Sequence, residues 1–295
     1  MLILFPSELS ESKKVDSAFL EECRAAESAG HDVGLINQDE LDAGNFQRAV
    51  ARVLGAGEEA VYRGWMQHPT HYKELQRSLE DNGIDLINNG RQYMNCHWFP
   101  GFYGYIENHT PESTWFCQYA NGYLGVDRLT EWVKKFGDTP LIIKDFVKSR
   151  KHEWDEACFV PSALDEEAFQ RVANTFIERQ GEFLAGGIVA RKFIPLMQIG
   201  IHDKSGAPLF NEYRTFVLNG KPMITGRYWS QGKLGDRPNL VEFDEVIKSV
   251  DNNFFTMDLA QTKQGDWIII ELGGGQVSGL QGIDLHLFYH ALNGK

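Results

Sequence analysis

The sequence lacks the marks of a secreted or membrane-spanning protein. Its four cysteines form no CxxC pair, which argues against a zinc ribbon or a thioredoxin-type motif. The apolar run at the N-terminus covers only Leu2 to Phe5, and charges follow it rather than precede it, so we expect no signal peptide. No apolar run approaches the roughly 20 residues that span a bilayer. We therefore expect a cytoplasmic protein with reduced thiols.

The sequence also lacks an excess of basic charge. It has 41 acidic and 29 basic residues, for a net charge of −12. This balance argues against nucleic acid or an anionic membrane as the main partner, since both select basic surfaces. A small anionic ligand is still possible, because a local basic cluster or Mg²⁺ can hold phosphates within an acidic protein. The 42% hydrophobic content of the 295 residues is enough for a sizeable core, and the length predicts about two domains.

The first 110 residues alternate between strand and helix patterns. Such alternation predicts βαβ units and a parallel sheet. An aromatic-rich stretch then follows, which we interpret as a connection. The expected strands are 2–5, 33–37, 59–64 and 85–88, the helices are 15–30 and 70–83, and the connection is 93–113.

From about residue 124 the pattern changes to helices mixed with antiparallel strands. Asn219-Gly220 is a strong hairpin signal, and a second hairpin is expected to turn near Gly265. No internal repeat occurs. The expected helices are 126–138, 165–182 and 283–292, and the expected strands include 140–147, 157–162 and 186–196. The fold class is therefore α/β followed by α+β.

The glycines of "GGGQVSG", Gly273, Gly275 and Gly279, approach a GxGxxG dinucleotide fingerprint. That fingerprint needs a helix and then a second parallel strand with an acid about 20 residues on. Only 16 residues follow Gly279, which leaves no room for that strand. The dinucleotide interpretation is therefore disfavoured, and the sequence has no GxxxxGK[ST] motif either.

Two acids stand in very apolar strands, Asp258 in "FFTMDLA" and Glu271 in "WIIIEL". A carboxylate in such a strand needs a partner. If the two strands are antiparallel neighbours, the carboxylates meet and repel each other unless a cation lies between them. Two interpretations remain: a divalent metal site, or two acids that each pair with a base.

The basic residues are also grouped. Lys144 and Lys148 share one face of the strand "PLIIKDFVKS", roughly 13 Å apart, which suits the ends of a polyphosphate or a solvated basic edge. In the hairpin that turns at Asn219-Gly220, Glu212 and Arg214 share a face and Arg227 lies on the returning strand. These side chains suit phosphate contacts or cross-strand ion pairs.

Arg63, in "VYRGWM", lies at the carboxyl end of an expected parallel strand. Ligands of open α/β sheets bind at that edge. An arginine at this place could equally tether a loop. Both interpretations remain open from the residues alone.

In their order along the chain, these motifs resemble the ATP-grasp superfamily, and within it the clade marked by one arginine and two lysines. "YRGW", "IIKDFVKS" and "FFTMDLAQTKQGDWIIIELGGGQVSGLQGID" carry the resemblance, which covers nearly the whole chain. It implies an N-terminal parallel-sheet α/β domain over 1–115. A lid subdomain over 116–190 and a C-terminal subdomain with a metal site over 191–295 would form an ATP-binding region rich in antiparallel strands.

The resemblance also implies a role for each grouped residue. Lys144 and Lys148 would hold the phosphates of ATP, and Asp258 and Glu271 would bind Mg²⁺. Arg63 would face the acceptor substrate or the terminal phosphate. The transferring phosphoryl group would be stabilised by Arg214 and Arg227, and the nucleotide would be held by Arg191, Lys192, Phe193, Ile194 and Glu212.

This sequence departs from the family pattern at two positions. The usual third metal ligand is an Asn two residues after the Glu, and here that position is Gly273. Either two carboxylates and water suffice, or Gln276 reaches in. In the hinge, Lys192 stands where many members carry an acid.

The implied activity is an ATP-dependent ligase that activates a carboxylate as an acylphosphate and joins it to an amine, forming a peptide-like amide bond. The implied cofactors are ATP and Mg²⁺, and residues 124–185 would close as a lid. The partners would be ATP, an unidentified carboxylate and an unidentified amine, with peptides, protein termini and small amino acids all open as substrates. The alternatives are a phosphotransferase on the same fold and a nucleotide-binding module with lost chemistry.

Overall fold

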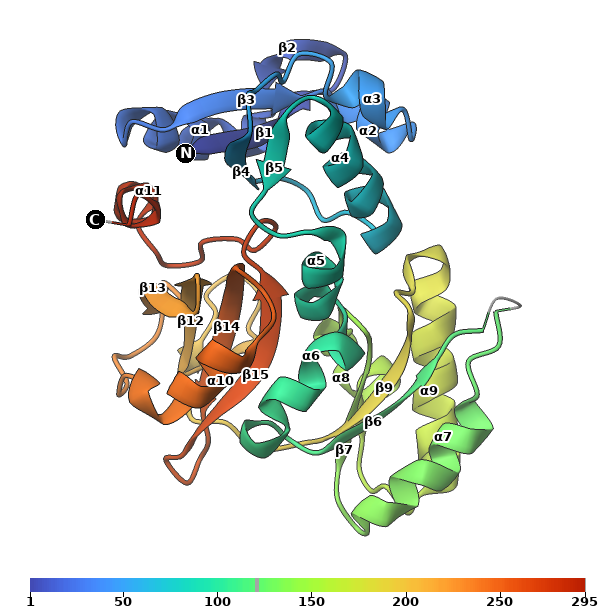
Figure 1. The fold of residues 1–295 in the computed structure, drawn as a ribbon. Helices are drawn as coiled ribbons and strands as arrows, with labels where there is room; N and C mark the ends of the chain where they lie inside the picture. Colours follow the sequence, from blue (N-terminus) through green and yellow to red (C-terminus); the bar gives the residue numbers. More distant parts are fainter. Residues whose placement is uncertain (120–121, 295) are drawn as a thin grey trace.

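Parallel strands form the N-terminal sheet of this computed structural model, which describes residues 1–119 and 122–294. β1 (Leu2–Glu8) pairs in parallel with β3 (Asp32–Ile36) on one side and β4 (Glu58–Tyr62) on the other. β4 pairs in parallel with β5 (Ile84–Leu86), and β2 (Glu11–Val15) folds back on the end of β1. The predicted parallel α/β sheet is therefore confirmed (Figure 1).

Helices pack on this sheet, and the last helix of the described chain returns to it. α1 packs against α11, so the C-terminal segment lies beside the N-terminal domain (Figure 1). The core between them includes Phe5, Val61 and Phe288. The elements are η1 (Ser17–Phe19), α1 (Leu20–Ser28), α2 (Gln38–Asp42), α3 (Phe46–Ala49), α4 (Pro69–Asp81) and α11 (Leu285–Leu292).

The expected connection at 93–113 is wrong: most of it is helical. α5 (Gly90–His97) and α6 (Phe99–Ile106) are followed by η2 (Glu107–His109). α5 begins with a capping box, in which the Asn89 side chain accepts from the backbone of Gln92 at 2.9 Å and the Gln92 side chain accepts from the backbone of Asn89 at 3.0 Å. Pro100 lies in the first turn of α6, where its missing N–H breaks no helical bond.

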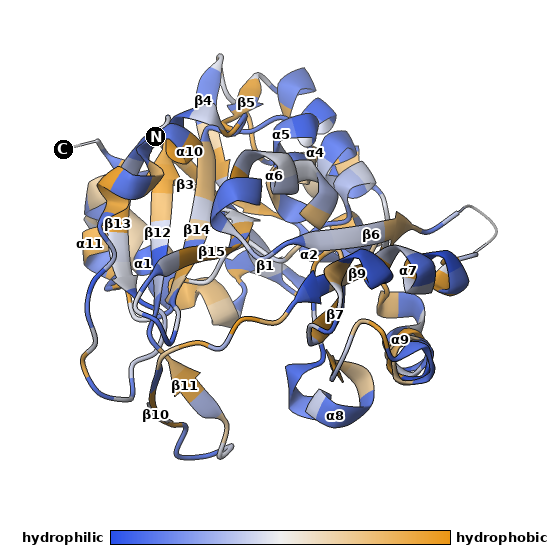
Figure 2. Cartoon of the chain, turned by 90° about the horizontal axis from the view of Figure 1, so that it is seen from below, coloured by the Kyte–Doolittle hydropathy of each residue, from blue (hydrophilic) through white to orange (hydrophobic). Residues whose placement is uncertain are grey.

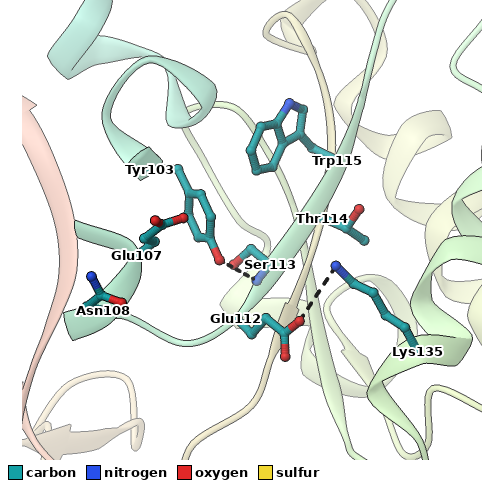
Figure 3. A pocket seen from close by; sticks show the side chains of 8 residues that line it. All are labelled: Tyr103, Glu107, Asn108, Glu112, Ser113, Thr114, Trp115 and Lys135. Carbon is teal, nitrogen blue, oxygen red and sulfur yellow. Dashed lines mark hydrogen bonds and ion pairs between the residues drawn. The ribbon is translucent and has the colours of Figure 1, made fainter. Parts of the chain in front are cut away.

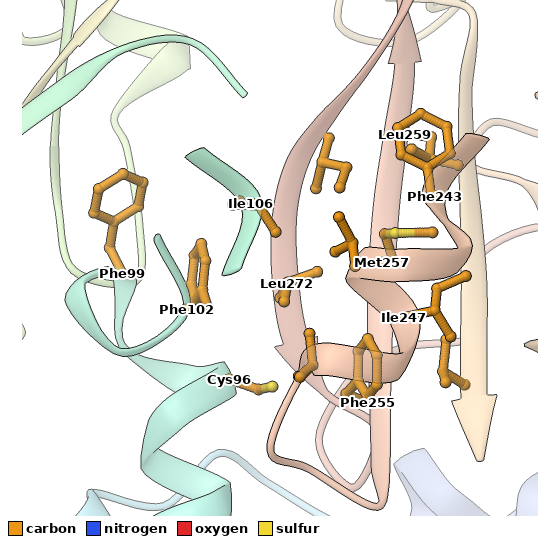
Figure 4. Close-up of a cluster of buried hydrophobic side chains, with 14 of the residues drawn as sticks. Cys96, Phe99, Phe102, Ile106, Phe243, Ile247, Phe255, Met257, Leu259 and Leu272 are labelled. Atoms are coloured by element: carbon orange, nitrogen blue, oxygen red, sulfur yellow. The ribbon is translucent and has the colours of Figure 1, made fainter. Parts of the chain in front are cut away.

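These two helices join the N-terminal domain to the C-terminal sheet. Their buried side chains, among them Cys96, Phe102 and Ile106, face Met257 and Leu272 of that sheet (Figure 4). Burial of apolar surface contributes roughly 25 cal/mol per Å². The aromatic stretch is therefore an interior layer.

The middle sheet has the strand order β6-β9-β7-β8 and is antiparallel throughout. α7 and α9 pack on it and bury Phe136, Phe169 and Phe176. The predicted amphipathic helix at 165–182 is confirmed as α9. The elements are β6 (Ser113–Cys117), α7 (Val126–Val133), η3 (Lys134–Phe136), β7 (Leu141–Asp145), η4 (Lys151–Glu153), α8 (Trp154–Ala157), β8 (Phe159–Val160), α9 (Glu166–Gln180), η5 (Gly181–Phe183) and β9 (Gly187–Lys192).

The strands of the middle sheet extend across both of the predicted domain boundaries. The boundary between 115 and 116 falls inside β6, and the boundary between 190 and 191 falls inside β9. Both strands pair within the middle sheet. The middle unit thus begins with the first residue of β6 and ends with the last residue of β9.

The C-terminal sheet has the order β13-β12-β14-β15 and is also antiparallel. Asn219 and Gly220 turn the first hairpin with φ of 49° and 70°, as the Asn-Gly signal predicts, and Gly265 turns the second with φ of 102°. Figure 2 shows hydrophobic residues concentrated in β12 and β14. The elements are β10 (Gln198–Ile201), β11 (Pro208–Phe210), β12 (Glu212–Leu218), β13 (Lys221–Arg227), η6 (Leu240–Phe243), α10 (Asp244–Ser249), β14 (Phe254–Gln261) and β15 (Trp267–Gly274).

Within residues 1–119 and 122–294, no helix combines the length and the hydropathy needed to cross a bilayer. The cytoplasmic location stays a prediction.

Candidate active site

Asp258 and Glu271 lie opposite each other on β14 and β15, as the sequence predicts. The register of the two strands shifts between Asp258 and Leu259, directly beside this pair. Two carboxylates that face each other on adjacent strands repel unless positive charge lies near them. The structure supplies that charge from two other strands.

Arg214 provides the first cation. From β12 its Nε and Nη2 donate to the two carboxylate oxygens of Asp258 at 2.8 and 2.6 Å. Burial raises the pKa of Asp258, whereas the Arg214 guanidinium opposes that shift. The bidentate pair is nearly enclosed, and a paired, hydrogen-bonded carboxylate can stay ionised there.

Lys144 provides the second cation. It is buried on β7, and its Nζ lies 3.4 Å from Oε1 of Glu271, so the middle and C-terminal sheets meet at this contact. The Lys144 Nζ also lies 5.8 Å from the centre of the Phe99 ring. Lys144, Arg214, Asp258 and Glu271 are called the charge cluster below. With two positive and two negative groups, it is formally neutral.

Lys148 is positioned by a carboxylate that sequence analysis missed. Asp145 is buried, and its Oδ1 accepts from the backbone N–H groups of Val147 and Lys148 at 2.7 and 2.5 Å. Its Oδ2 accepts from Gln180 at 2.8 Å. Asp145 therefore turns the chain after β7 and leaves the side chain of Lys148 exposed. An Asp between two lysines followed by a turn was the available signal.

The residues predicted to contact the nucleotide lie at the end of β9, Arg191 and Lys192, and directly after it, Phe193 and Ile194. Arg191 turns its side chain away from solvent and donates to the carbonyls of Ile270 and Ile269 at 2.6 and 3.2 Å. Burial lowers its pKa to about 10. Lys192 pairs with Glu112 at 2.9 Å. Both side chains thus hold the hinge in place.

The rest of the hinge is apolar. The ring of Phe193 lies 5.6 Å from Trp154 and 5.5 Å from Phe159, and the last two rings stack at 5.1 Å. All three rings and Ile194 are half-buried. Phe193 stands edge-on to the stacked pair, at 71° and 85°, and this half-open aromatic wall suits a planar apolar ligand.

Glu212 lies on the same face of β12 as Arg214. Burial raises its pKa, and its Oε2 accepts from the Trp229 indole at 2.7 Å. Tyr228 covers the Arg214 guanidinium, 5.1 Å from the ring centre, and burial raises the pKa of Tyr228 to about 12. Trp229 and Tyr228 were not anticipated from the sequence.

Arg227 is not brought together with Arg214. In the β12–β13 register Gly226 is opposite Arg214 and Arg227 is opposite Tyr213. Side chains alternate along a strand, so Arg227 lies on the other face of the sheet. Its Nη2 donates to the carbonyls of Gln231, Gly232 and Lys233 at 3.0 to 3.2 Å.

Arg63 also lies apart from the charge cluster. It is 2% exposed, and its guanidinium donates twice to Oε2 and once to Oε1 of Glu22, at 2.7 to 3.1 Å. Its Nη1 donates to the carbonyls of Gly275 and Ser278 at 2.6 and 2.9 Å. The predicted contact with a substrate stays a prediction; every nitrogen of this guanidinium already has a protein partner.

Neither the position of Gly273 nor the side chain of Gln276 supplies a third metal ligand in the structure. A Cβ on Gly273 would lie 2.7 Å from Oγ1 of Thr256 and 2.9 Å from Oγ of Ser278, two hydroxyls that are bonded to each other at 3.0 Å. Gln276 is fully buried, and its Nε2 donates to the Tyr72 hydroxyl at 3.1 Å. The described residues contain no group of three or more His, Cys, Asp or Glu side chains that could hold a metal ion.

His97, at the end of α5, is a further neighbour of the charge cluster. Its ring stacks on Tyr93 at 5.0 Å. Burial lowers its pKa to about 4, which the negative charge of Glu271 opposes and the charge of Lys148 reinforces. His97 falls in the stretch 93–113, which was interpreted from the sequence as a connection, and no role was predicted for it.

A hollow of about 560 Å³ opens elsewhere, at the edge of β6 (Figure 3). The Tyr103 hydroxyl accepts a hydrogen bond there from the backbone of Ser113 at 3.2 Å, and Lys135 pairs with Glu112 at 3.6 Å. None of the described residues that line it is a predicted site residue.

Two of three comparisons place the chain among known proteins. The model of an ATP-grasp domain, family 3 of the clade named for one arginine and two lysines, matches residues 135–292, which is more than half of the chain. The search of curated proteins found no match. The matched residues include the whole charge cluster.

Solved structures share the fold at low sequence identity. An ATP-grasp RimK domain protein from Sphaerobacter thermophilus is 13% identical, with a TM-score of 0.58 over 98% of this chain and 97% of that one. D-cycloserine synthetase DcsG is 10% identical, with a TM-score of 0.59 over 99% and 98%. ATP-grasp ligase PsnB, complexed with a phosphomimetic precursor variant, Mg and ADP, is 11% identical, with a TM-score of 0.58 over 99% and 97%.

Proposed function

The chain belongs to the ATP-grasp family, in the clade named for one arginine and two lysines, and on this premise we propose that it is an ATP-dependent carboxylate–amine ligase that uses Mg²⁺. The observation that carries the proposal is the charge cluster, in which Lys144 of the middle sheet meets Glu271 of the C-terminal sheet beside the Arg214–Asp258 pair. Its residues come from both parts of the ATP-binding region.

The phosphates of ATP fit the basic side of this site. Lys144 and the exposed Lys148 lie at the two ends of the turn held by Asp145, and Arg214 adds a rigid donor fork. In the structure Lys144 contacts the carboxylate of Glu271 and Arg214 contacts that of Asp258. A triphosphate with its metal offers each of them an alternative partner of the same charge.

The metal fits the acidic side. Asp258 and Glu271 supply two carboxylates, which is the donor set that Mg²⁺ takes when substrate phosphates and water fill its other positions. Bound there, the ion would neutralise phosphate charge. The Gln276 side chain is buried and donates to the Tyr72 hydroxyl at 3.1 Å, which favours the two-carboxylate alternative over a ligand from Gln276.

The adenine has a candidate wall beside the hinge. Phe193, Trp154 and Phe159 present half-buried rings there. Arg191 and Lys192 fix the strand that leads into this wall, because Arg191 binds β15 and Lys192 pairs with Glu112. We assign Ile194 and Glu212 to the border of the same nucleotide site.

The reaction needs no nucleophile from the chain. An oxygen of the substrate carboxylate attacks the γ-phosphorus and ADP leaves, which forms an acylphosphate. The amine then attacks the acyl carbon, phosphate leaves with the electrons of the broken C–O bond, and the amine proton passes to solvent. Lys144, Lys148 and Arg214 hold the phosphates in line and offset the charge that develops. Closure of the lid at 124–185 would exclude water from the acylphosphate.

The product class is a peptide-like amide. Among the similar structures, DcsG is named as a synthetase of D-cycloserine and PsnB is complexed with precursor peptides. We therefore propose that the carboxylate belongs to an amino acid or a peptide.

An oxygen-labelling experiment tests this proposal. Phosphate release from ATP is first screened against carboxylate and amine pairs, with mass spectrometry of the products. The active carboxylate is then supplied with ¹⁸O. A ligase of this kind transfers one ¹⁸O to the released phosphate and forms an amide. A phosphorylated product without amine dependence would identify a phosphotransferase instead, and no ATP turnover with any pair would identify a binding module.

A further inference from the structure

The best-defined polar network outside the charge cluster surrounds Arg63. It joins three distant parts of the chain: α1 through Glu22, α11 through Tyr289, and the segment after β15. The Tyr289 hydroxyl donates to Oε2 of Glu22 at 2.7 Å, and the Arg63 guanidinium lies 5.3 Å from the centre of the Phe288 ring. A buried arginine with a bidentate carboxylate partner holds one fixed geometry.

Arg63 binds the segment after β15, residues 275–279, from the side of the N-terminal domain. We call it the β15 loop. Arg63 donates to the carbonyls of Gly275 and Ser278, and the backbone of Gly64 donates to the carbonyl of Gln276 at 3.3 Å. Three of the five carbonyls of this loop are thus bound by two consecutive residues at the end of β4.

Arg214 holds the same loop from the other side. Its Nη1 donates to the carbonyl of Gly279 at 2.7 Å, while its other two nitrogens bind Asp258. The Ser278 carbonyl bound by Arg63 and the Gly279 carbonyl bound by Arg214 are consecutive. The orientation of the Arg214 fork, and with it that of Asp258, therefore depends on where the β15 loop is held.

We propose that Arg63, paired with Glu22, is a positioning residue for the metal site: it fixes the β15 loop so that the Gly279 carbonyl holds Arg214 against Asp258 beside Glu271. The inference rests on the proposed metal and ATP site. It differs from a substrate contact, because Arg63 acts through two carbonyls and a second arginine. The N-terminal domain would thereby tune metal affinity without touching the metal.

The choice of arginine follows from the geometry. One nitrogen binds two carbonyls of the loop while the other two bind Glu22. A lysine offers one ammonium group and cannot span both sets of partners. Arg63→Lys therefore keeps the positive charge but cannot bind Glu22 and the two loop carbonyls at the same time.

A double-mutant cycle on Mn²⁺ affinity tests the inference. Mn²⁺ binding to the full chain is measured by electron paramagnetic resonance for wild type, Arg63→Lys, Arg214→Lys and the double variant. Loss of a residue that orients metal ligands weakens metal binding about 10- to 100-fold. We expect each single variant to fall in this range and the double variant to match Arg214→Lys alone, because both residues act on the same element.

Two results would overturn the inference: Mn²⁺ affinity of Arg63→Lys equal to that of wild type, or losses that multiply in the double variant. The exposed Arg24, paired with Glu21 on the same helix as Glu22, gives the control Arg24→Lys, which should bind Mn²⁺ like wild type. If Arg63→Lys fails to fold, Glu22→Gln takes its place in the same cycle. A wild-type protein that binds neither Mn²⁺ nor ATP contradicts the proposed function itself.

Discussion

Arg214 on β12 donates two hydrogen bonds to the carboxylate of Asp258 on β14, at 2.8 and 2.6 Å. Asp258 is largely buried on β14, a strand that is otherwise largely apolar, and it faces Glu271 of β15. The pair with Arg214 keeps this carboxylate stable there. Each of the two acids has a basic partner, which is the second interpretation from the sequence, and the metal site stays a prediction. Their basic partners are the side chains that the proposed function assigns to phosphate.

The first prediction concerns Lys144. Lys144→Met removes the buried ammonium beside Glu271 and the proposed phosphate contact. A charge-assisted hydrogen bond contributes about 1.5–3 kcal/mol, so the KM for ATP should rise about tenfold or more. Steady-state kinetics measures this. Lys14→Met, an exposed lysine paired with Glu11, serves as the control and should leave KM unchanged.

The second prediction concerns Asp145. Asp145→Ala leaves the N–H groups of Val147 and Lys148 without their acceptor and releases the turn that carries Lys148. We expect a loss of about 1–3 kcal/mol in the free energy of unfolding and weaker ATP binding. Urea unfolding and calorimetry measure the two effects. Asp138, which lies outside the turn, provides the comparison, and an equal loss in Asp138→Ala would contradict this role.

The third prediction concerns Gly273. Restoring the family's asparagine by Gly273→Asn should destabilise the protein, because the added Cβ meets Thr256 and Ser278 at 2.7 and 2.9 Å. Overpacking of this kind costs about 1–3 kcal/mol, and the Tm should fall accordingly. Gly279→Ala has open space, with the nearest atom 3.8 Å away, and should keep its Tm. A rise in both Tm and metal affinity in Gly273→Asn would show that the third ligand fits after all.

The fourth prediction concerns pH. Burial lowers the pKa of His97 to about 4 from an ordinary value of 6.5. Between these two values the unfolded chain binds more protons at this site than the folded one, so stability rises with pH and is lost as the pH falls from 6.5 to 4. The shift corresponds to at most about 3 kcal/mol. His97→Phe should lose less stability than wild type across this window in urea titrations, whereas the exposed His286→Phe should follow the wild type.

Much of the fold could be predicted because it depends on local periodicity. The parallel strands, the helix at 165–182 and the Asn219-Gly220 hairpin each carry their signal within a few residues. The helix α6 was missed because its aromatic residues pack on more than one side, which removes the amphipathic pattern. The helix α5 does bury one face, with Tyr93 and Cys96, but it has only eight residues. The capping box at Asn89 and Gln92 and the position of Pro100 were further local signals for these helices.

The site was predictable only in part, for a different reason. Asp258 and Glu271 were predicted because each stands in an apolar strand where a charge needs a partner, and Lys144 because it shares a strand face with Lys148. The partners themselves depend on tertiary structure. Glu22 lies 41 residues before Arg63 and Gly275 lies 212 residues after it, so no spacing in the sequence connects them. The direction of the Arg63 side chain therefore required the folded chain.

The most direct test of the account is the Mg²⁺ dependence of nucleotide binding at Glu271. Calorimetry with a non-hydrolysable ATP analogue, with and without Mg²⁺, compares wild type with Glu271→Gln. If Asp258 and Glu271 hold the ion, Mg²⁺ tightens binding to wild type and this gain is lost in Glu271→Gln, while circular dichroism shows the same fold for both. An undiminished Mg²⁺ effect in Glu271→Gln would contradict the central claim.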